Sequence, residues 1–341
     1  MLSKFPILRV PQLVLTEIIN QIEPGDLIPL SLCSKNMFRL TQFHRTNAID
    51  VKLSIAGRKD YNLVCTWKAG ETTLNKHILK ASKNGDQNLE TTETVEIANE
   101  CVPVSIDEKK GCLCTFWVDQ VKGFQVMTSH VTKLLKKDIE MVFFDADSLW
   151  MMDWIKTVQT GLQVAHFNRT DSFTEDQYTY VLENCEANVL MLNAKPPQSF
   201  EYKKDFPERN FVVFEHGFWI TVENFLNMKF SCVLIRESKL TTVDMNAFLK
   251  HWLSGGSPQL KYLSIQIDGN VEALLADLEE EVMPIQNHRE FDLNIVYQER
   301  IHFVVSIEIR QENGNRATFF YHPARKIFQM VVGDNFIEWS W

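Results

Sequence analysis

Two aspartates in the stretch Phe143-Phe144-Asp145-Ala146-Asp147-Ser148 have types and spacing that suggest chemistry. They follow an apolar run, so a phosphatase-like reaction that uses carboxylates and Mg²⁺ is one hypothesis for them. The alternative is that Asp147 or Ser148 caps a helix beginning at Leu149. Because a later acidic pair is not evident after a suitable strand, capping is favoured over phosphatase-like chemistry.

Cys112-Leu113-Cys114, with Cys101 upstream and His130 downstream, is the candidate metal-binding group. On a strand Cys112 and Cys114 face the same side, so a zinc site is conceivable. The group lacks the cysteine pairs separated by two residues that many zinc sites use, and buried free thiols are common in cores. We therefore predict no metal.

The remaining polar motifs predict structure rather than catalysis. The glycines of Ser254-Gly255-Gly256-Ser257 follow a helical pattern, whereas a phosphate loop precedes its helix, so they are expected to end that helix. The acidic run 277–281 is expected to be a solvated helix face. Four tryptophans lie in apolar patterns typical of a core or its rim: Trp117, Trp219, Trp252 and Trp339. With no His-Glu-x-x-His or Gly-x-Ser-x-Gly motif, the sequence predicts no enzyme and no cofactor.

The charge balance narrows the choice of partners. The 341-residue chain has 35 Lys and Arg against 44 Asp and Glu, a net charge of −9. This balance disfavours nucleic acids and anionic membrane surfaces. No window approaches the ~18 apolar residues of a transmembrane helix, and the N-terminus lacks a signal-peptide core. The seven scattered cysteines suit a reducing compartment, so we predict the cytoplasm or nucleus.

Short apolar strands alternate with helical patterns between residues 139 and 267. The strands recur every 21 to 30 residues, near Val142, Val164, Val189, Val212, Val233 and Leu263. The helical patterns between them are Leu149–Val158, Glu175–Leu182, Val222–Met228 and Val243–Leu253. Five of the strands share the spacing apolar-x-x-apolar-x-apolar, and Phe211–Phe214 departs from it. Such a period and spacing are typical of a leucine-rich-repeat solenoid, whose neighbouring units share one core.

The flanking segments alternate apolar and polar residues as half-buried strands do. Expected strands on the N-terminal side are Val51–Ile55, Leu63–Trp67, Leu113–Val118 and Phe124–Thr128, the last two as a hairpin around Lys122-Gly123. Those on the C-terminal side are Phe303–Ile309, Ala317–Tyr321, Ile327–Val332 and Phe336–Trp341. Asn313-Gly314 is a strong hairpin signal. We expect this antiparallel sheet to cap the open end of the solenoid.

Residues 5 to 44 predict three short helices. Pro11 suits the start of the first, because the missing donor of proline costs nothing in a first helical turn. Ser34 can cap the third. Pro29 would interrupt the second helix unless that helix starts late or bends. The residues expected on the inner faces of the first two helices are Leu15, Ile18, Ile19, Ile22, Leu27, Leu30 and Leu32.

Several segments occur in a distinctive order. They are Phe5-Pro6-Ile7-Leu8-Arg9-Val10-Pro11, Ile18-Ile19, and Glu23-Pro24-Gly25-Asp26-Leu27-Ile28-Pro29-Leu30-Ser31-Leu32-Cys33-Ser34-Lys35. In that order they resemble an F-box. Later, Trp219–Leu226, Leu240–Gly256 and Leu260–Ile265 resemble the F-box-associated type 2 domain of a large nematode F-box family. The expected fold is α/β: a three-helix F-box (1–45), a β-rich segment (46–138), an irregular leucine-rich-repeat-like strand–helix solenoid (139–270) and a C-terminal antiparallel β segment (271–341).

The resemblance implies a substrate-recognition subunit of a Skp–cullin–F-box type ubiquitin ligase, which binds a Skp-family adaptor, through it a cullin, and an unidentified protein target. By position in the motif, the adaptor-binding residues are Leu8, Pro11, Leu15, Ile18, Leu27 and Leu30. Each of them can instead pack internally. Outward positions on the repeat strands, expected to bind the target, are Asp145, His166, Asn168, Asn193, Arg236 and Gln266. The alternatives are a solenoid scaffold without a ligase role and, less favoured, the phosphatase-like enzyme.

Overall fold

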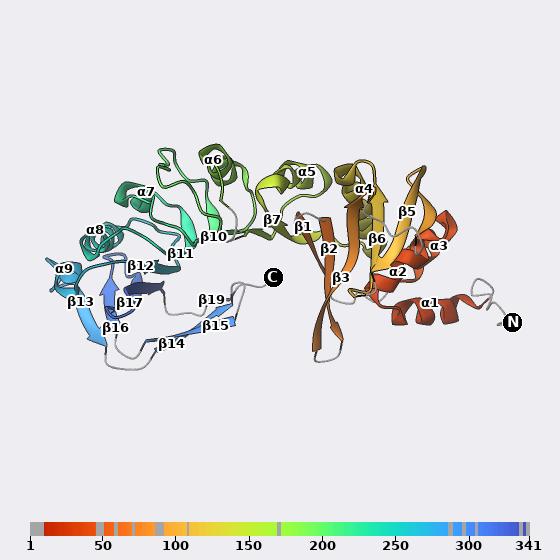
Figure 1. Cartoon of the computed structure of the whole chain (residues 1–341). Helices are drawn as coiled ribbons and strands as arrows, with labels where there is room; N and C mark the ends of the chain where they lie inside the picture. The colour runs from red at the N-terminus through yellow and green to blue at the C-terminus, as the bar shows by residue number, and fades with distance from the viewer. Residues whose placement is uncertain are drawn as a thin grey trace. The chain divides into compact units, whose positions relative to one another are not determined.

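The chain folds into a mixed α/β structure with two compact units, residues 1–165 and 166–341. The structure is a computed structural model. It describes residues 10–45, 51–57, 61–69, 72–85, 92–107, 109–168, 172–285, 289–294, 298–303, 306–333 and 337–338. Each unit contains β-sheet with helices packed beside it (Figure 1).

Three helices open the first unit, at the places that the sequence predicts. They are α1 (Gln12–Gln21), α2 (Pro24–Leu32) and α3 (Lys35–His44). Pro11 stands just before α1, and the Ser34 hydroxyl accepts from the Met37 backbone N at 3.1 Å to cap α3. Of the two ways in which the sequence allows Pro29, a late start of α2 is excluded, because α2 begins at Pro24 and contains Pro29.

Arg45 ties the end of α1 to the end of α3. Its Nη1 donates to the Ile19 and Ile22 carbonyls at 3.0 and 2.7 Å, satisfying acceptors that a helix terminus leaves open. Thr16 Oγ1 also lies 2.7 Å from His44 Nδ1. The guanidinium therefore holds the ends of the two helices together.

The sheet of the first unit has the strand order β7-β1-β2-β3-β6-β5-β4. Its strands are β1 (Lys52–Gly57), β2 (Tyr61–Ala69), β3 (Thr72–Lys83), β4 (Glu93–Ile97), β5 (Glu100–Asp107), β6 (Cys112–Trp117) and β7 (Ile139–Phe144). The predicted β1–β2 pair is antiparallel, whereas β1 pairs in parallel with β7. The β-rich segment is thus joined directly to the first strand of the repeat pattern.

The predicted hairpin around Lys122-Gly123 is wrong. Residues Gln120–Leu135 form helix α4, and the Asp119 side chain accepts from the Lys122 backbone N to cap it. Every third or fourth residue is buried, at Phe124, Met127, Val131 and Leu134. That spacing is typical of a helix that packs along one face. Burial of this face outweighs the strand preference of the local β-branched and aromatic residues.

The second unit alternates parallel strands with helices. Its parallel strands are β8 (Val164–Phe167), at the boundary of the two units, β9 (Val189–Leu192), β10 (Arg209–Phe214), β11 (Phe230–Ile235) and β12 (Tyr262–Gln266). The helices are α6 (Glu175–Asn184), α7 (Val222–Leu226) and α8 (Thr242–Leu253), and they lie on one face of these strands in Figure 1. The predicted strands and helices of this stretch are confirmed as elements.

Each of these helices starts in the same way. Thr174, Thr221 and Thr241 occupy the N-cap, and each exchanges hydrogen bonds with the residue three positions on. This reciprocal cap satisfies two backbone donors and turns the chain from a loop into a helix. The helix end at Ser254-Gly255 is confirmed: the Gly255 N donates to the Trp252 carbonyl, and its φ is +94°.

Antiparallel strands extend the sheet beyond β12, in the order β12-β18-β17-β16-β13. The strands are β13 (Val282–Ile285), β16 (Ser306–Arg310), β17 (Arg316–His322) and β18 (Ile327–Val332). The predicted β16–β17 hairpin is confirmed, with Gly314 at φ +92°. A second sheet has the order β15-β14-β19, from β14 (Arg289–Asn294), β15 (Gln298–Phe303) and β19 (Ile337–Glu338).

The acidic run 277–281 is solvated, as expected, but it is not a helix face. Helix α9 (Val271–Leu275) ends before it, and the run lies in turns with only Leu278 buried.

The tryptophan prediction is confirmed for Trp117, Trp219 and Trp252, which are buried. Trp339 lies outside the described residues.

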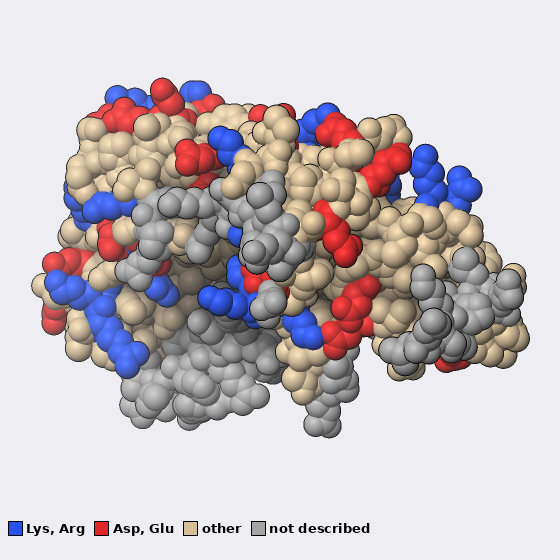
Figure 2. Space-filling model, turned by 45° about the vertical axis from the view of Figure 1, so that its right-hand side comes forward, with Lys and Arg blue, Asp and Glu red and all other residues tan. Residues whose placement is uncertain are grey.

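Two further observations bear on partners. Within the described residues, no helix is both long and apolar enough to cross a membrane. On the face drawn in Figure 2, acidic and basic side chains are interspersed.

Candidate functional site

Four polar residues occupy equivalent positions at the carboxyl ends of adjacent parallel strands. Leu192, Phe214, Ile235 and Ile265 are in register across β9, β10, β11 and β12. The next residue on each strand is polar, and we call these residues the polar row: Asn193, Glu215, Arg236 and Gln266. Since the carboxyl ends of parallel strands share one edge of a sheet, the polar row presents a continuous line of donors and acceptors.

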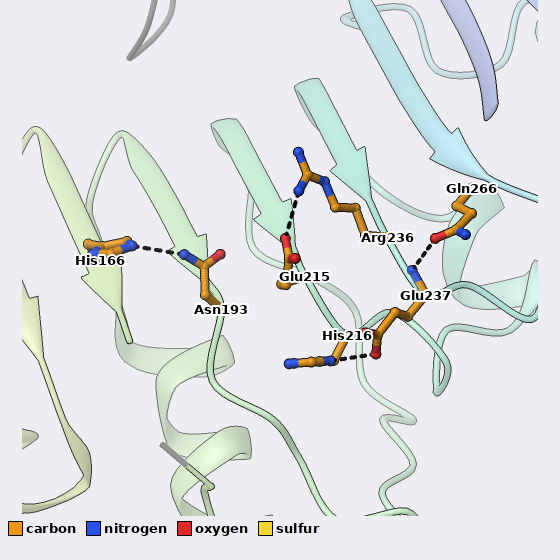
Figure 3. Close-up of polar contacts among 7 residues, drawn as sticks. All are labelled: His166, Asn193, Glu215, His216, Arg236, Glu237 and Gln266. Atoms are coloured by element: carbon orange, nitrogen blue, oxygen red, sulfur yellow. Dashed lines mark hydrogen bonds and ion pairs between the residues drawn. The ribbon is translucent and has the colours of Figure 1, made fainter. Parts of the chain in front are cut away.

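Side chains link the polar row to its neighbours (Figure 3). Asn193 Nδ2 lies 2.8 Å from His166 Nε2, and Arg236 Nη1 lies 3.4 Å from Glu215 Oε2. Gln266 Oε1 accepts from the backbone N of Glu237 at 2.9 Å. These contacts run across the strands, so they hold the side chains in fixed positions relative to one another.

A second pair lies one residue further along the chain. His216 Nδ1 is 2.6 Å from Glu237 Oε2 (Figure 3). His216 is only 7% exposed and Glu215 8% exposed, whereas the side chains of Arg236 and Glu237 are 61% and 49% exposed. The site is therefore anchored at the end of β10 and opens to solvent at the end of β11.

This arrangement suits recognition of a polar protein surface. The side chain of Arg236 is mostly exposed while that of Glu215 is buried, so the guanidinium is accessible to a partner while it pairs with Glu215. Gln266 and Glu237 add exposed amide and carboxylate groups beside it. A mixture of both charges with neutral donors and acceptors is what protein-interaction surfaces use for specificity.

Gly217 lets the ends of β10 and β11 approach closely behind the site. Its backbone N donates to the Arg236 carbonyl at 2.8 Å. A Cβ added at Gly217 would lie 2.3 Å from Ile235 Cγ2 and 3.0 Å from the Arg236 carbonyl oxygen. Glycine is required here because the Ile235 side chain is buried and the Arg236 carbonyl is backbone, so neither moves readily.

We expect Gly217→Ala to lower the free energy of unfolding by about 2 kcal/mol, the usual cost of overpacking a core. Urea unfolding followed by circular dichroism measures it. Gly256→Ala is the matched control: its Cβ would meet the half-buried imidazole of His251, which can turn towards solvent. Equal stability of the two variants would contradict the role assigned to Gly217.

Four of the six residues predicted to bind the target come together in this site: His166, Asn193, Arg236 and Gln266. Asn168 follows β8 in the same unit. Asp145 belongs to the first unit. Sequence reasoning missed Glu215, His216 and Glu237. Glu215 and His216 directly follow a strand of valines and phenylalanines, and a polar pair immediately after a buried parallel strand is the signal that would have found them.

Asp145 serves as a cap in the structure. It precedes a short 3₁₀ helix (Ala146–Ser148), and its backbone N donates to Ser148 Oγ at 2.8 Å. Helix α5 (Trp150–Val158) follows with Leu149 as its N-cap, so the prediction that Asp147 or Ser148 caps a helix starting at Leu149 is wrong in its detail. Ser148 instead closes the turn back onto Asp145.

The residues assigned to an adaptor are unequally exposed. Leu15 and Leu27 are buried within the chain, 5% and 0% exposed. Pro11 is exposed, Ile18 and Leu30 are half-buried, and Leu8 lies outside the described residues. The large exposed apolar side chains on these helices are others: Leu13 (75%), Val14 (44%) and Phe43 (70%).

Residues 201–265 match a family model described as F-box associated. The matched stretch contains β10, α7, β11 and α8, and with them Glu215 and Arg236 of the polar row. This stretch is thus similar to the F-box-associated family, which is a protein-interaction family rather than a known enzyme family.

Two proteins of Caenorhabditis elegans are similar to the chain. Skn-1 dependent zygotic transcript 15 protein is 21% identical over 289 residues, which cover 77% of this chain and 79% of that protein. E3 ubiquitin-protein ligase hecw-1 is 36% identical over 70 residues, 20% of this chain and 6% of that protein. The second likeness therefore concerns a short segment of a much longer protein. No solved structure matches the chain.

Proposed function

We propose that the chain is the substrate-recognition subunit of a Skp–cullin–F-box type ubiquitin ligase, acting in the cytoplasm or nucleus. The N-terminal helices α1–α3 form an F-box that binds the Skp-family adaptor. The strand–helix region is a leucine-rich-repeat-like solenoid that holds a protein target, and ubiquitin transfer takes place on other subunits. The match of residues 201–265 to the F-box-associated family supports this proposal.

The observation that carries the proposal is the apolar surface left open on the N-terminal helices. Leu13 and Phe43 are 75% and 70% exposed, although α1 and α3 are tied together by Arg45. Large apolar side chains that stay exposed on ordered helices gain by covering a partner, and a few such residues can supply most of the binding free energy.

The structure changes which residues we assign to the adaptor. Pro11, Ile18 and Leu30 remain assigned to it, and Leu13, Val14 and Phe43 join them. Leu15 and Leu27 are assigned to internal packing, because they are buried without any partner present. Helix α2 is held against the sheet and α4: a Cβ at Gly25 would lie 3.2 Å from Ile78, and Ser31 Oγ lies 2.7 Å from His130 Nε2.

The target surface in this proposal is the polar row with His166, His216 and Glu237. Arg236, Glu237 and Gln266 are exposed there on adjacent strands, so one extended segment of a target can contact all of them. Their pairing within the chain sets their directions before a target binds, which reduces the entropy lost on binding.

The test is adaptor binding by Leu13→Glu/Phe43→Glu in the full chain. We expect its affinity for a purified Skp-family adaptor to fall at least roughly a hundredfold, because two apolar anchors are replaced by charges that would be buried in the interface. Isothermal titration calorimetry measures the affinity, and circular dichroism checks that the variant is folded.

Val118→Glu/Val243→Glu is the matched control, since these valines are 87% and 63% exposed and lie outside the N-terminal helices. It should bind the adaptor like the unmodified chain. If the unmodified chain fails to bind the adaptor, or the Leu13/Phe43 variant binds equally well, the ligase role is refuted and a scaffold without a ligase role remains.

A further inference from the structure

Three metal-ligand side chains from two strands meet in the first unit. Asp107 pairs directly with Cys112 across β5 and β6, and Cys114 is two residues further along the same strand face. One ligand atom of each, the Asp107 carboxylate oxygen and the two thiol sulfurs, lies within 4.8 Å of the other two. Cys112 and Cys114 are 1% and 6% exposed, so the group is shielded from solvent on the β6 side.

The carboxylate of this group is fixed and ionised. Asp107 Oδ1 accepts from the backbone N of Lys109 at 3.0 Å and of Lys110 at 3.1 Å. The hydrogen bond from Lys110 is the largest cause that lowers the Asp107 pKa, with burial opposing it and the Lys109 bond adding to it. The Asp107 side chain is therefore held as an anionic ligand at the end of β5.

The thiols of Cys112 and Cys114 form a hydrogen bond with each other. The hydrogen bond between them lowers the pKa of Cys114 and raises that of Cys112, and burial raises both. Lys80, which is in register with Cys114 on β3, also lowers the Cys114 pKa. The two sulfurs therefore lie side by side on one face of β6, where both can contact one thiophilic cation.

Strand β3 places a histidine on the same face. A bulge shifts the β2–β3 register, so that Asn62 pairs with Lys80 and Val64 pairs with His77. Asn62 and Val64 share a face of β2, and their partners Lys80 and His77 therefore share the face of Cys114. His77 Nδ1 is buried and has no hydrogen-bond partner in the described part of the chain.

The His77 ring interacts electrostatically with Asp107 of the group. Burial is the largest cause that lowers its pKa, Lys110 lowers it further, and Asp107 raises it. Neutral imidazole is the form that binds metals. The other candidates from the sequence do not join: Cys101 pairs with Glu96 at the far end of β5, and His130 contacts Ser31.

We propose that Asp107, Cys112 and Cys114 bind a Zn²⁺ ion and that His77 completes its tetrahedral ligand set. Thiolate, imidazole and carboxylate are the ligands zinc takes in proteins. As the two Zn–S bonds form, each thiol releases its proton to solvent. Two thiolates and one carboxylate leave a net charge of −1 on the complex, which Lys80 and Lys110 offset. The ion would join β3, β5 and β6.

The test uses the full chain, reduced and stripped of metal with a chelator. Titration with Zn²⁺ against a chromophoric competitor should show one site per chain, and Co²⁺ should give the near-ultraviolet charge-transfer band of cobalt–thiolate bonds. Cys112→Ser, Cys114→Ser and Asp107→Asn should each weaken Zn²⁺ binding by more than the roughly 10–100-fold that loss of an outer-shell partner costs. His77→Asn should weaken it as well.

Cys65→Ser is the matched control, because Cys65 is a buried thiol of the same sheet that is not part of the group. It should bind Zn²⁺ and Co²⁺ like the unmodified chain. A wild-type chain without stoichiometric Zn²⁺ uptake and without the cobalt–thiolate band would overturn the site, a result that does not depend on the folding of any variant. Unchanged affinity in His77→Asn would overturn the assignment of the fourth ligand.

Discussion

Gly123→Ala should lower the free energy of unfolding by about 3 kcal/mol and the thermal midpoint by roughly 10 °C, although alanine normally stabilises a helix over glycine. The reason is Trp117, at the end of β6. A Cβ at Gly123 would lie 2.1 Å from Trp117 Cγ. Trp117 is 3% exposed and its Nε1 donates to Thr115 Oγ1 at 2.9 Å, so the indole cannot move aside without breaking that bond. Differential scanning calorimetry measures the change.

A double-mutant cycle separates the steric effect from helix propensity. In a Trp117→Ala background the Cγ, Cδ1 and Cδ2 atoms that meet the new Cβ are absent. Gly123→Ala should then be neutral, or stabilising by up to about 1 kcal/mol. The same loss of stability in both backgrounds would show that the contact between α4 and Trp117 is not its cause.

Acid should destabilise the first unit through His130. Its pKa is lowered to about 4, chiefly by burial and then by Lys133. The ring lies against Phe38, with centroids 4.8 Å apart, and beside Ser31, so it connects α4 to the N-terminal helices. Protonating it inside the fold is therefore unfavourable, whereas the unfolded chain binds that proton near pH 6.5.

The direction in which pH changes the free energy of unfolding follows from proton uptake on unfolding. Above about pH 6.5 both states are neutral at His130 and the stability is complete; as the pH falls from there towards 4, the unfolded state binds the proton first and stability is lost. Between pH 7.5 and 4.5 this residue should account for roughly 2–3 kcal/mol. Urea unfolding across that range measures the loss.

His130→Gln is the control, because glutamine keeps a side-chain donor and does not titrate. The difference in stability between the unmodified chain and this variant should change with pH by the same 2–3 kcal/mol, approximately. A difference that stays constant from pH 7.5 to 4.5 would contradict the half-buried, neutral state of His130.

The sequence predicts the parts of this fold that local interactions decide. The strands β7, β8, β9, β11 and β12 follow from their apolar spacing, the end of α8 from Gly255, and the β16–β17 hairpin from Asn313-Gly314, because each signal lies within a few residues of the structure it produces. Helix α4 shows where this fails. Its segment holds valine, threonine and phenylalanine, which suit strands, and only burial of one face against the sheet selects the helix.

The sequence alone also determined which kinds of residue can form binding sites in this protein: free thiols, dispersed charges, and polar residues at strand ends. Tertiary structure decided which of them meet. Parallel register aligned Asn193, Glu215, Arg236 and Gln266 from four strands, and antiparallel register brought Asp107 to Cys112 and Cys114. It also buried Leu15 and Leu27 while leaving Leu13 and Phe43 open. These outcomes depend on contacts between residues far apart in the chain. The residues next to a hydrophobic or ionisable side chain in the sequence do not indicate which distant residues will pack against it.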